Sequence, residues 1–262
     1  MTNRVMALWF PRLGAERWLR LGACPRSVPL VTVEGPPAKR SVVATTAAAE
    51  ACGLHPGQTH DQAAEICPAV VALPADERAE ARLLGSLARA AGWLGLRAKT
   101  EGRRGITIHL DAGTAMLGPE EAVVARALTE GARVGLSVRP GVADSALAAW
   151  ALACHGRSGP GGNGRIARPG RSRAALAPLP VKALGLGPAA LRRLGRIGVT
   201  RVGEVTDLPP AAIRHYLGAE VADRVEEAFG AEPHRTPQQE ADGAEIVPLA
   251  PLGRVARRSW HA

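Results

Sequence analysis

The basic side chains between Ser145 and Gly203 are the residues whose number and spacing most clearly allow chemistry. This stretch contains ten Lys and Arg residues and no Asp or Glu, in a chain of 262 residues with a net charge of +9. Clustered arginines can neutralise the phosphates of a nucleic acid, whereas a run of like charge can also be only a solvated face. Charge alone leaves both interpretations open. The ten residues are Arg157, Arg165, Arg168, Arg171, Arg173, Lys182, Arg192, Arg193, Arg196 and Arg201.

Within this stretch, the segment from Leu191 to Leu208 has the pattern of a helix-hairpin-helix. Two apolar-periodic segments flank a tight turn in which Gly195 and Gly198 bracket Ile197. We expect backbone N–H groups at the turn and at the start of the second helix to point outward, where they can hold a phosphate. The predicted DNA-binding residues are Arg192, Arg193, Gly195, Arg196, Ile197, Gly198 and Arg201, with Arg165, Arg168, Arg171 and Arg173 adding charge nearby.

The other polar residues form no comparable pattern. His55 and His60 are typical of ordinary loop histidines, and the remaining acidic residues fit solvated helix faces. No apolar run is long enough to cross a bilayer, and the N-terminus lacks a secretory pattern. The cysteines lack zinc-ligand spacing, so we expect a reduced, cytoplasmic protein without a structural metal or cofactor. These cysteines are Cys24, Cys52, Cys67 and Cys154.

Hydrophobic periodicity predicts the elements that must position these side chains. Residues 5–10 are an apolar run closed by Pro11, which predicts a buried strand. Along the chain, predicted strands alternate with predicted helices, which is typical of an α+β fold in which helices cover one face of a mainly antiparallel sheet. Further strands are predicted at residues 70–73, 96–101, 105–111 and 134–139, and helices at 74–94, 119–133 and 142–154.

Three other regions differ in composition from this α+β part. Between residues 12 and 69, short helices alternate with predicted strands at 29–34 and 41–45. Residues 156–173 are rich in Gly, Arg, Ser and Pro, which predicts a flexible basic connector. Residues 178–229 are predicted to be entirely helical. After Gly230 the composition becomes polar and Pro-rich, so we expect a poorly ordered tail.

Taken in order, these pieces resemble the Y-family translesion DNA polymerases. The closest resemblance is to the ImuB branch, whose catalytically degenerate members occur in bacterial damage-inducible (SOS-type) mutagenesis cassettes. The motifs that carry it lie at residues 5–17, 42–57, 63–74, 105–111, 141–153 and 179–218, in one consistent order over residues 4–233. Each motif alone is weak, whereas the shared order makes chance a poor explanation.

The resemblance implies a domain organisation. A ferredoxin-like palm would comprise residues 1–11 and 70–155, with a small fingers insertion at residues 12–69. A basic flexible linker at 156–174 would lead to a helix-hairpin-helix thumb at 175–231. Residues 232–262 would be a disordered tail or the start of a truncated little-finger domain.

The resemblance also implies which functional positions have changed. The palm carboxylates that hold two Mg²⁺ ions in active relatives fall at Ala7, Ile106 and Thr107. The aromatic residue that excludes ribonucleotides falls at Arg12, and the residues that contact the incoming triphosphate fall at Ala47 and Glu50. Because side chains without carboxylates cannot replace the water shell of Mg²⁺, we expect neither metal nor nucleotide to bind.

We therefore expect a DNA-binding, non-catalytic accessory protein of DNA repair and error-prone translesion synthesis. The resemblance implies sequence-independent binding of primer–template DNA, a replicative-type error-prone polymerase and a RecA-like accessory protein as partners, and no membrane association. The C-terminal residues show no recognisable sliding-clamp peptide. Three alternatives stay open: a low-activity Mg²⁺-dependent polymerase that uses Asp111 or Asp144, a module that docks another polymerase, and an unrelated helix-hairpin-helix protein.

Overall fold

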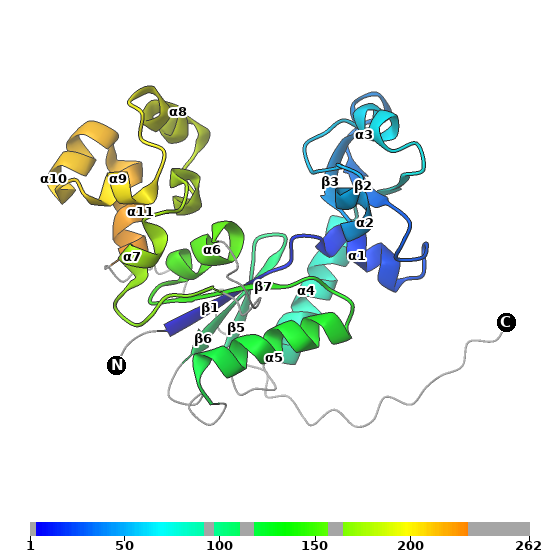
Figure 1. Cartoon of the computed structure of the whole chain (residues 1–262), viewed down its shortest axis with the longest axis horizontal. Coiled ribbons are helices and arrows are strands. Elements are labelled where there is room, and N and C mark those ends of the chain that lie inside the picture. The colour runs from blue at the N-terminus through cyan, green and yellow to red at the C-terminus, as the bar shows by residue number, and fades with distance from the viewer. Residues whose placement is uncertain (1–3, 92–96, 111–117, 157–164, 230–262) are drawn as a thin grey trace. The chain divides into compact units, whose positions relative to one another are not determined.

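A five-stranded sheet forms the centre of the protein. The computed structural model describes residues 4–91, 97–110, 118–156 and 165–229. The strand order is β5-β6-β1-β7-β8, and β1 pairs antiparallel with both of its neighbours (Figure 1). The strands are β1 (Arg4–Trp9), β5 (Ala98–Glu101), β6 (Gly105–Leu110), β7 (Arg139–Ala143) and β8 (Arg165–Ile166). The strands predicted over residues 5–10 and 105–111 are confirmed by β1 and β6, which covers Gly105–Leu110.

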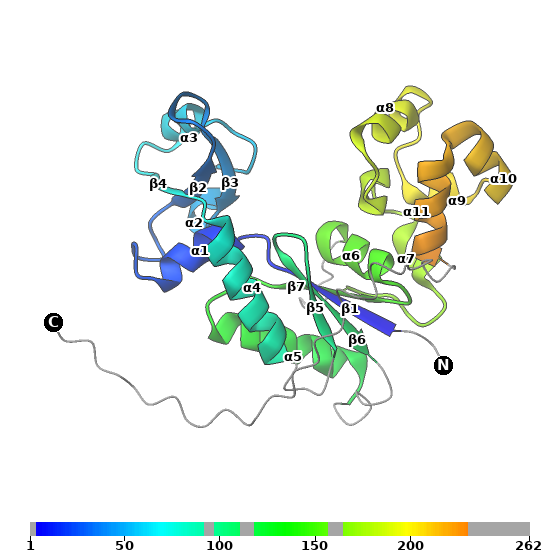
Figure 2. The ribbon, with the colours of Figure 1, turned by 180° about the vertical axis from the view of Figure 1, so that it is seen from behind.

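Helices cover both faces of this sheet. On one face, α4 (Glu77–Ala91) and α5 (Glu120–Arg133) bury the side chains of Met6, Leu8 and Ile108. On the other face, α6 (Ala146–His155) packs on Val5 and Ala7. Figure 2 shows α4 and α5 on one side of the strands and α6 on the other side.

The prediction that helices cover only one face is therefore wrong. The second face is covered because the backbone of α6 lies close against β7, with Gly141 beneath the helix. A Cβ on Gly141 would stand 2.3 Å from Ala149 O and 2.6 Å from Ala153 N. Glycine and alanine at this contact let α6 lie directly on the sheet, so residues of β1 are buried from both sides.

A smaller sheet is formed by residues from the first third of the chain. Its order is β3-β2-β4, with β2 (Leu30–Glu34), β3 (Ser41–Thr45) and β4 (Val71–Pro74). The strands predicted at residues 29–34 and 41–45 are confirmed by β2 and β3. Because β4 pairs parallel with β2, residues 71–74 belong to this sheet rather than to the palm, which corrects the boundary predicted at residue 70. The helices around it are α1 (Leu13–Arg20), α2 (Ala47–Ala51), α3 (His60–Ile66) and the 3₁₀ turn η1 (Pro37–Lys39).

Polar caps fix the short helices of this smaller sheet. Thr46 accepts a hydrogen bond from Ala49 N and so caps α2. Thr59 and Gln62 form a reciprocal capping box at the start of α3. These caps satisfy N–H groups that short helices otherwise leave without an acceptor.

The described residues after β8 are helical, as predicted for 178–229. They pack on α6 through one shared core that includes Leu152, Leu176, Leu184 and Leu194. The elements are α7 (Ser172–Leu176), η4 (Val181–Leu184), α8 (Pro188–Arg196), α9 (Val202–Thr206), α10 (Pro210–Ala212), η5 (Ile213–Leu217) and α11 (Ala219–Phe229).

Part of the predicted flexible connector at residues 156–174 forms regular secondary structure. Residues 157–164, with Arg157, lie outside the described part of the chain, whereas Arg165–Ile166 form β8, parallel to β7. Ser172 then begins α7, so the second half of the connector is built into the fold. Asp111 and the tail at 232–262 also lie outside the described residues. Among the described helices, none is both long and apolar enough to cross a membrane.

Candidate nucleic-acid interface

The register of β1 and β6 brings together two of the three positions that the resemblance assigns to metal ligands. Ala7 stands opposite Thr107 and both side chains face α6. Ile106 lies next in β6, so its side chain points to the opposite face and into the core beneath α4 and α5. Ala7 is 0% exposed, Ile106 1% and Thr107 4%. These positions are sealed core rather than an open site.

Trp150 of α6 fills the space over this pair. Its indole Nε1 donates a hydrogen bond to Thr107 Oγ1 at 3.1 Å. A Cβ on Gly105 would lie only 1.7 Å from the Trp150 ring, so the indole rests directly on the β6 backbone. The sequence signal for this contact is the glycine at position 105, because a side chain there would overlap the Trp150 ring.

The donor set at this position does not fit Mg²⁺. The ion requires oxygen ligands, usually carboxylates, in near-octahedral geometry. Ala7 offers no ligand atom, and the Thr107 hydroxyl already accepts a hydrogen bond from Trp150. Among the described residues, no group of three or more His, Cys, Asp or Glu side chains could hold a metal ion.

The positions assigned to nucleotide contacts are joined to each other by an ion pair. Arg12 Nε and Nη2 donate to Glu50 Oε1 and Oε2 at 2.8 and 2.5 Å, a bidentate arrangement. Hydrogen bonds from Arg12 hold the pKa of Glu50 below its ordinary value. Arg12 also donates to Ser137 Oγ, while Ala47 is exposed at the start of α2. Sequence reasoning placed Arg12 and Glu50 separately and missed that they neutralise each other.

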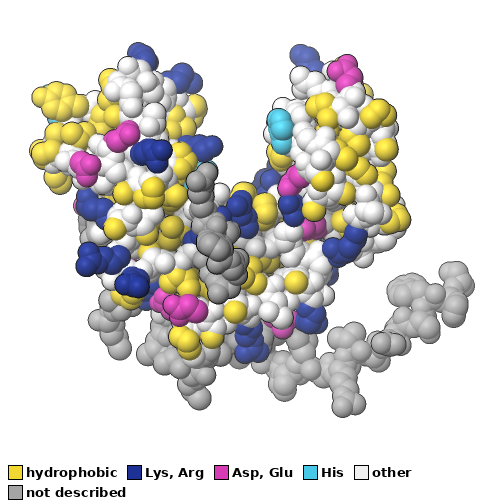
Figure 3. Space-filling view, viewed as in Figure 1, with side chains coloured by type: hydrophobic (Ala, Val, Ile, Leu, Met, Phe, Trp, Pro, Cys, Tyr) yellow, Lys and Arg dark blue, Asp and Glu magenta, His cyan; other side chains and the backbone are white. Residues whose placement is uncertain are grey.

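Helices α8 and α9 and the turn between them form where the hairpin was predicted, and the basic side chains of α8 are exposed. Gly198 has φ +78°, a left-handed conformation that favours glycine, and follows α8 at the turn. Arg192, Arg193 and Arg196 are exposed and form no salt bridge within the described part of the chain. In Figure 3, Lys and Arg side chains in dark blue lie over α8. Three uncompensated guanidinium groups therefore project from one short helix and its turn.

The backbone mechanism expected for this hairpin is wrong. Every N–H group from residue 197 to residue 203 already has an acceptor within the chain. Thr200 N and Arg201 N both donate to the Glu204 carboxylate, at 2.6 and 3.1 Å, which lowers the pKa of Glu204. The other acceptors are the carbonyl oxygens of Leu194, Gly195, Leu179 and Ala177. The amide groups around Gly195, Ile197 and Gly198 are therefore already engaged within the chain, whereas the arginine side chains of α8 are exposed.

The other predicted arginines divide into two groups. Arg168 and Arg171 are exposed, as expected for charge that could reach DNA. Arg201 donates to Pro178 O, and Arg173 donates to Thr206 O and lies over the Phe229 ring. Arg165 is 8% exposed and donates to Leu152 O and Ala153 O, which corrects its assignment as a DNA contact.

Asp144, the described carboxylate considered for a polymerase, has a structural role. It pairs with the buried Arg4 at 2.8 Å and accepts hydrogen bonds from Ser172 Oγ and Gly170 N. Burial would raise the pKa of Asp144, but these hydrogen bonds outweigh it and the net pKa is lowered. Asp144 thus joins β7 to the segment that begins α7.

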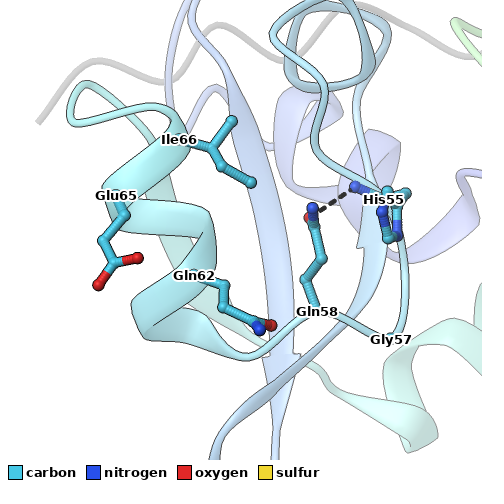
Figure 4. A pocket seen from close by; sticks show the side chains of 6 residues that line it. All are labelled: His55, Gly57, Gln58, Gln62, Glu65 and Ile66. Carbon is cyan, nitrogen blue, oxygen red and sulfur yellow. Dashed lines mark hydrogen bonds between the residues drawn. The ribbon is translucent and has the colours of Figure 1, made fainter.

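Two cavities among the described residues have linings that include neither Ala7 nor Thr107. One, of about 340 Å³, is lined by His55, Gly57, Gln58, Gln62, Glu65 and Ile66 in the smaller-sheet region (Figure 4). His55 N donates to Gln58 Oε1 there, and nothing in this lining resembles a metal site. A second, of about 440 Å³, is lined by residues of α1, α5 and the loop before β7, including Glu16 and Ser137.

Comparisons with known proteins identify relatives of this chain by sequence. No protein-family model matches the chain. Over 179 residues, 68% of the chain, it is 36% identical to protein ImuB of Caulobacter vibrioides, from strain NA1000 / CB15N and from strain ATCC 19089. It spans 38% of the length of these relatives.

Solved polymerases share the fold. DinB from Sulfolobus solfataricus is similar with a TM-score of 0.66 at 17% identity, over 86% of this chain and 66% of DinB. The insertion ternary complex of Dbh DNA polymerase is similar with a TM-score of 0.68 at 16% identity, over 86% of this chain and 67% of Dbh.

Proposed function

The chain is an ImuB-like member of the Y family of DNA polymerases, and from this premise we propose that it binds DNA without polymerising it. It would act as an accessory protein in DNA repair and error-prone translesion synthesis. The sealed position at Ala7 and Thr107 carries this proposal, because Trp150 occupies the space where two metal ions would have to sit.

Loss of the metal position removes the main source of catalysis in phosphoryl transfer. Metal ions supply several kcal/mol of transition-state stabilisation when they bridge the reacting oxygens. The described residues provide no carboxylate to hold such ions at Ala7, and the Arg12–Glu50 pair satisfies the charges at the nucleotide positions. We therefore expect no Mg²⁺-dependent nucleotide incorporation.

DNA binding would rest on the helices from α7 to α11, which we assign to the thumb. The exposed Arg192, Arg193 and Arg196 are available to phosphates, since no acid pairs with them in the described part of the chain. Arginine side chains recognise backbone phosphates without reading sequence. The contact would thus be sequence-independent.

The test reverses these three charges. Changing Arg192, Arg193 and Arg196 to Glu should abolish binding of labelled primer–template DNA, measured by fluorescence anisotropy. The control changes Arg78, Arg82 and Arg89 to Glu, three exposed arginines of α4. It matches the charge change at a helix that covers the other face of the sheet. Equal affinity of both variants and the wild type would overturn the assignment.

Two protein partners follow from the resemblance as further proposals. A replicative-type error-prone polymerase would perform synthesis, and a RecA-like protein would assist it. Co-purification of each candidate with this chain tests them, with the arginine variant as the control for association bridged by DNA. A sliding-clamp contact has no support in this sequence.

A further inference from the structure

An aromatic residue and an arginine meet where one strand of the larger sheet ends and its neighbour begins, and the first of these strands also carries the buried Ala7. Trp9, the last residue of β1, is paired with Arg139, the first residue of β7. The Arg139 guanidinium lies over the Trp9 ring, 5.4 Å from its centroid. This cation–π contact holds an exposed guanidinium in place at the rim.

Two more basic residues, His155 and Lys182, lie near the same end of the sheet. Helix α6 runs back along β7, since Gly141 lies beneath Ala149 and Ala153, and it ends at His155 near the start of β7. Lys182 lies in η4, which packs against α6. Burial and then the charges of Lys182, Arg139 and Arg165 lower the pKa of His155, so these cations lie close enough to repel an imidazolium.

Arg139, Lys182 and His155 have no ion-pair partner among the described residues. The side chains of Arg139 and Lys182 are exposed. Glu50 is the acid whose field reaches Arg139, but both of its carboxylate oxygens are bound by Arg12. Cations gathered without a counter-charge repel one another, and an anion bound among them removes that repulsion.

We propose that Arg139, Lys182 and His155 bind a phosphate of the DNA backbone, without a metal ion. This inference rests on the DNA binding proposed above. It adds a second contact, formed between the start of β7 and η4 and named the palm contact below, to the one at α8. Arginine offers a planar fork of donors to phosphate, lysine a mobile point charge, and histidine a ring N–H. DNA is the favoured source of the phosphate because the Arg12–Glu50 pair closes the positions assigned to a nucleoside triphosphate.

The experiment removes two of these cations and compares them with a matched pair. Binding of labelled primer–template DNA is measured by anisotropy across a salt series in EDTA, for Arg139→Ala/Lys182→Ala and for Arg78→Ala/Arg82→Ala on α4. Each lost phosphate contact lowers the magnitude of the log–log salt slope by about 0.9. Because the proposed site holds one phosphate, the palm variant should lose about one such step, and the α4 variant none.

The outcomes separate this inference from the proposed function. No binding by the wild type would overturn both. Binding by the wild type with an unchanged slope and affinity in the palm variant would overturn the palm contact alone. Binding of a labelled deoxynucleoside triphosphate that disappears in the palm variant would assign the site to a nucleotide and overturn its assignment to DNA. Thermal unfolding of both variants checks that neither has lost its fold.

Discussion

At the scale of single residues, Trp150 determines what the larger sheet can hold. Its ring lies against Gly105, and its Nε1 binds the Thr107 hydroxyl beside Ala7. One large side chain from α6 therefore replaces the polar, hydrated space that metal chemistry requires. The Trp150 side chain thus closes the site by packing, in addition to the absence of charged ligands there.

We predict that Trp150→Ala lowers the free energy of unfolding by about 3 kcal/mol, because it leaves a cavity and an unpaired Thr107 hydroxyl. Gly105→Ala alone should also destabilise the protein, since its Cβ would overlap the ring. In the Trp150→Ala background, the same glycine substitution should cost much less. Urea unfolding of the four proteins measures this coupling. Additive losses would show that the two residues do not contact each other.

A second residue-scale prediction concerns Glu50. The hydrogen bonds from Arg12 lower its folded pKa below the reference value of 4.5, so the pair stabilises the protein above that pH. This stability is lost as pH falls through the lowered pKa. Because both side chains are partly exposed, the effect should be at most about 1 kcal/mol. Glu50→Gln should be less stable than the wild type at neutral pH, and the gap should close in acid. A gap that widens in acid would contradict this sign.

At the scale of elements, Asp144 and Arg4 join three parts of the fold. Arg4 of β1 also binds Glu120 of α5 and Ala167 O after β8, while Asp144 holds Ser172 and Gly170. Arg4 is 5% exposed, so it needs these partners to remain buried as a charge.

We predict that Asp144→Asn loosens the segment from β8 to α7. Amide hydrogen exchange at residues 165–176 should speed up, and the free energy of unfolding should fall by about 1–3 kcal/mol. The matched control is Asp223→Asn, whose partner Arg214 and own side chain are more than half exposed. It should change neither quantity. Equal exchange in the two variants would show that Asp144 does not hold this segment.

Sequence patterns predicted the elements whose signals are local. An apolar run closed by Pro11 located β1 and a hairpin-like pair of segments located β6, and the register of the folded strands places Ala7 opposite Thr107. Strand β8 escaped prediction because two residues within a Gly- and Arg-rich stretch carry no periodic signal. The acceptors of the hairpin amides and the Arg12–Glu50 pair depend on contacts between segments that only folding brings together. Arg139 was not singled out because it precedes the acid-free stretch and lies alone in the sequence.

At the scale of the whole molecule, most of the described charged side chains lie on the surface, and none lies at the positions that the resemblance assigns to metal ligands. The chain carries a net charge of +9, and those positions hold Ala, Ile and Thr. Three of its exposed arginines lie on α8 and another stands at the start of β7. A polyanion is the partner that such a distribution favours. The same fold that positions reacting groups in polymerases would here position cations.

The most direct test of this account is the salt dependence of primer–template binding by the intact chain, measured by anisotropy in EDTA and again with Mg²⁺ and deoxynucleoside triphosphates. With four to six phosphate contacts at about 0.9 each, we predict a log–log slope of roughly −4 to −5 in EDTA, and a shallower slope with Mg²⁺ because the divalent ion competes for the same phosphates. The primer length should stay unchanged. Absence of binding at low salt, or primer extension once Mg²⁺ and nucleotides are present, would contradict a DNA-binding protein that does not polymerise.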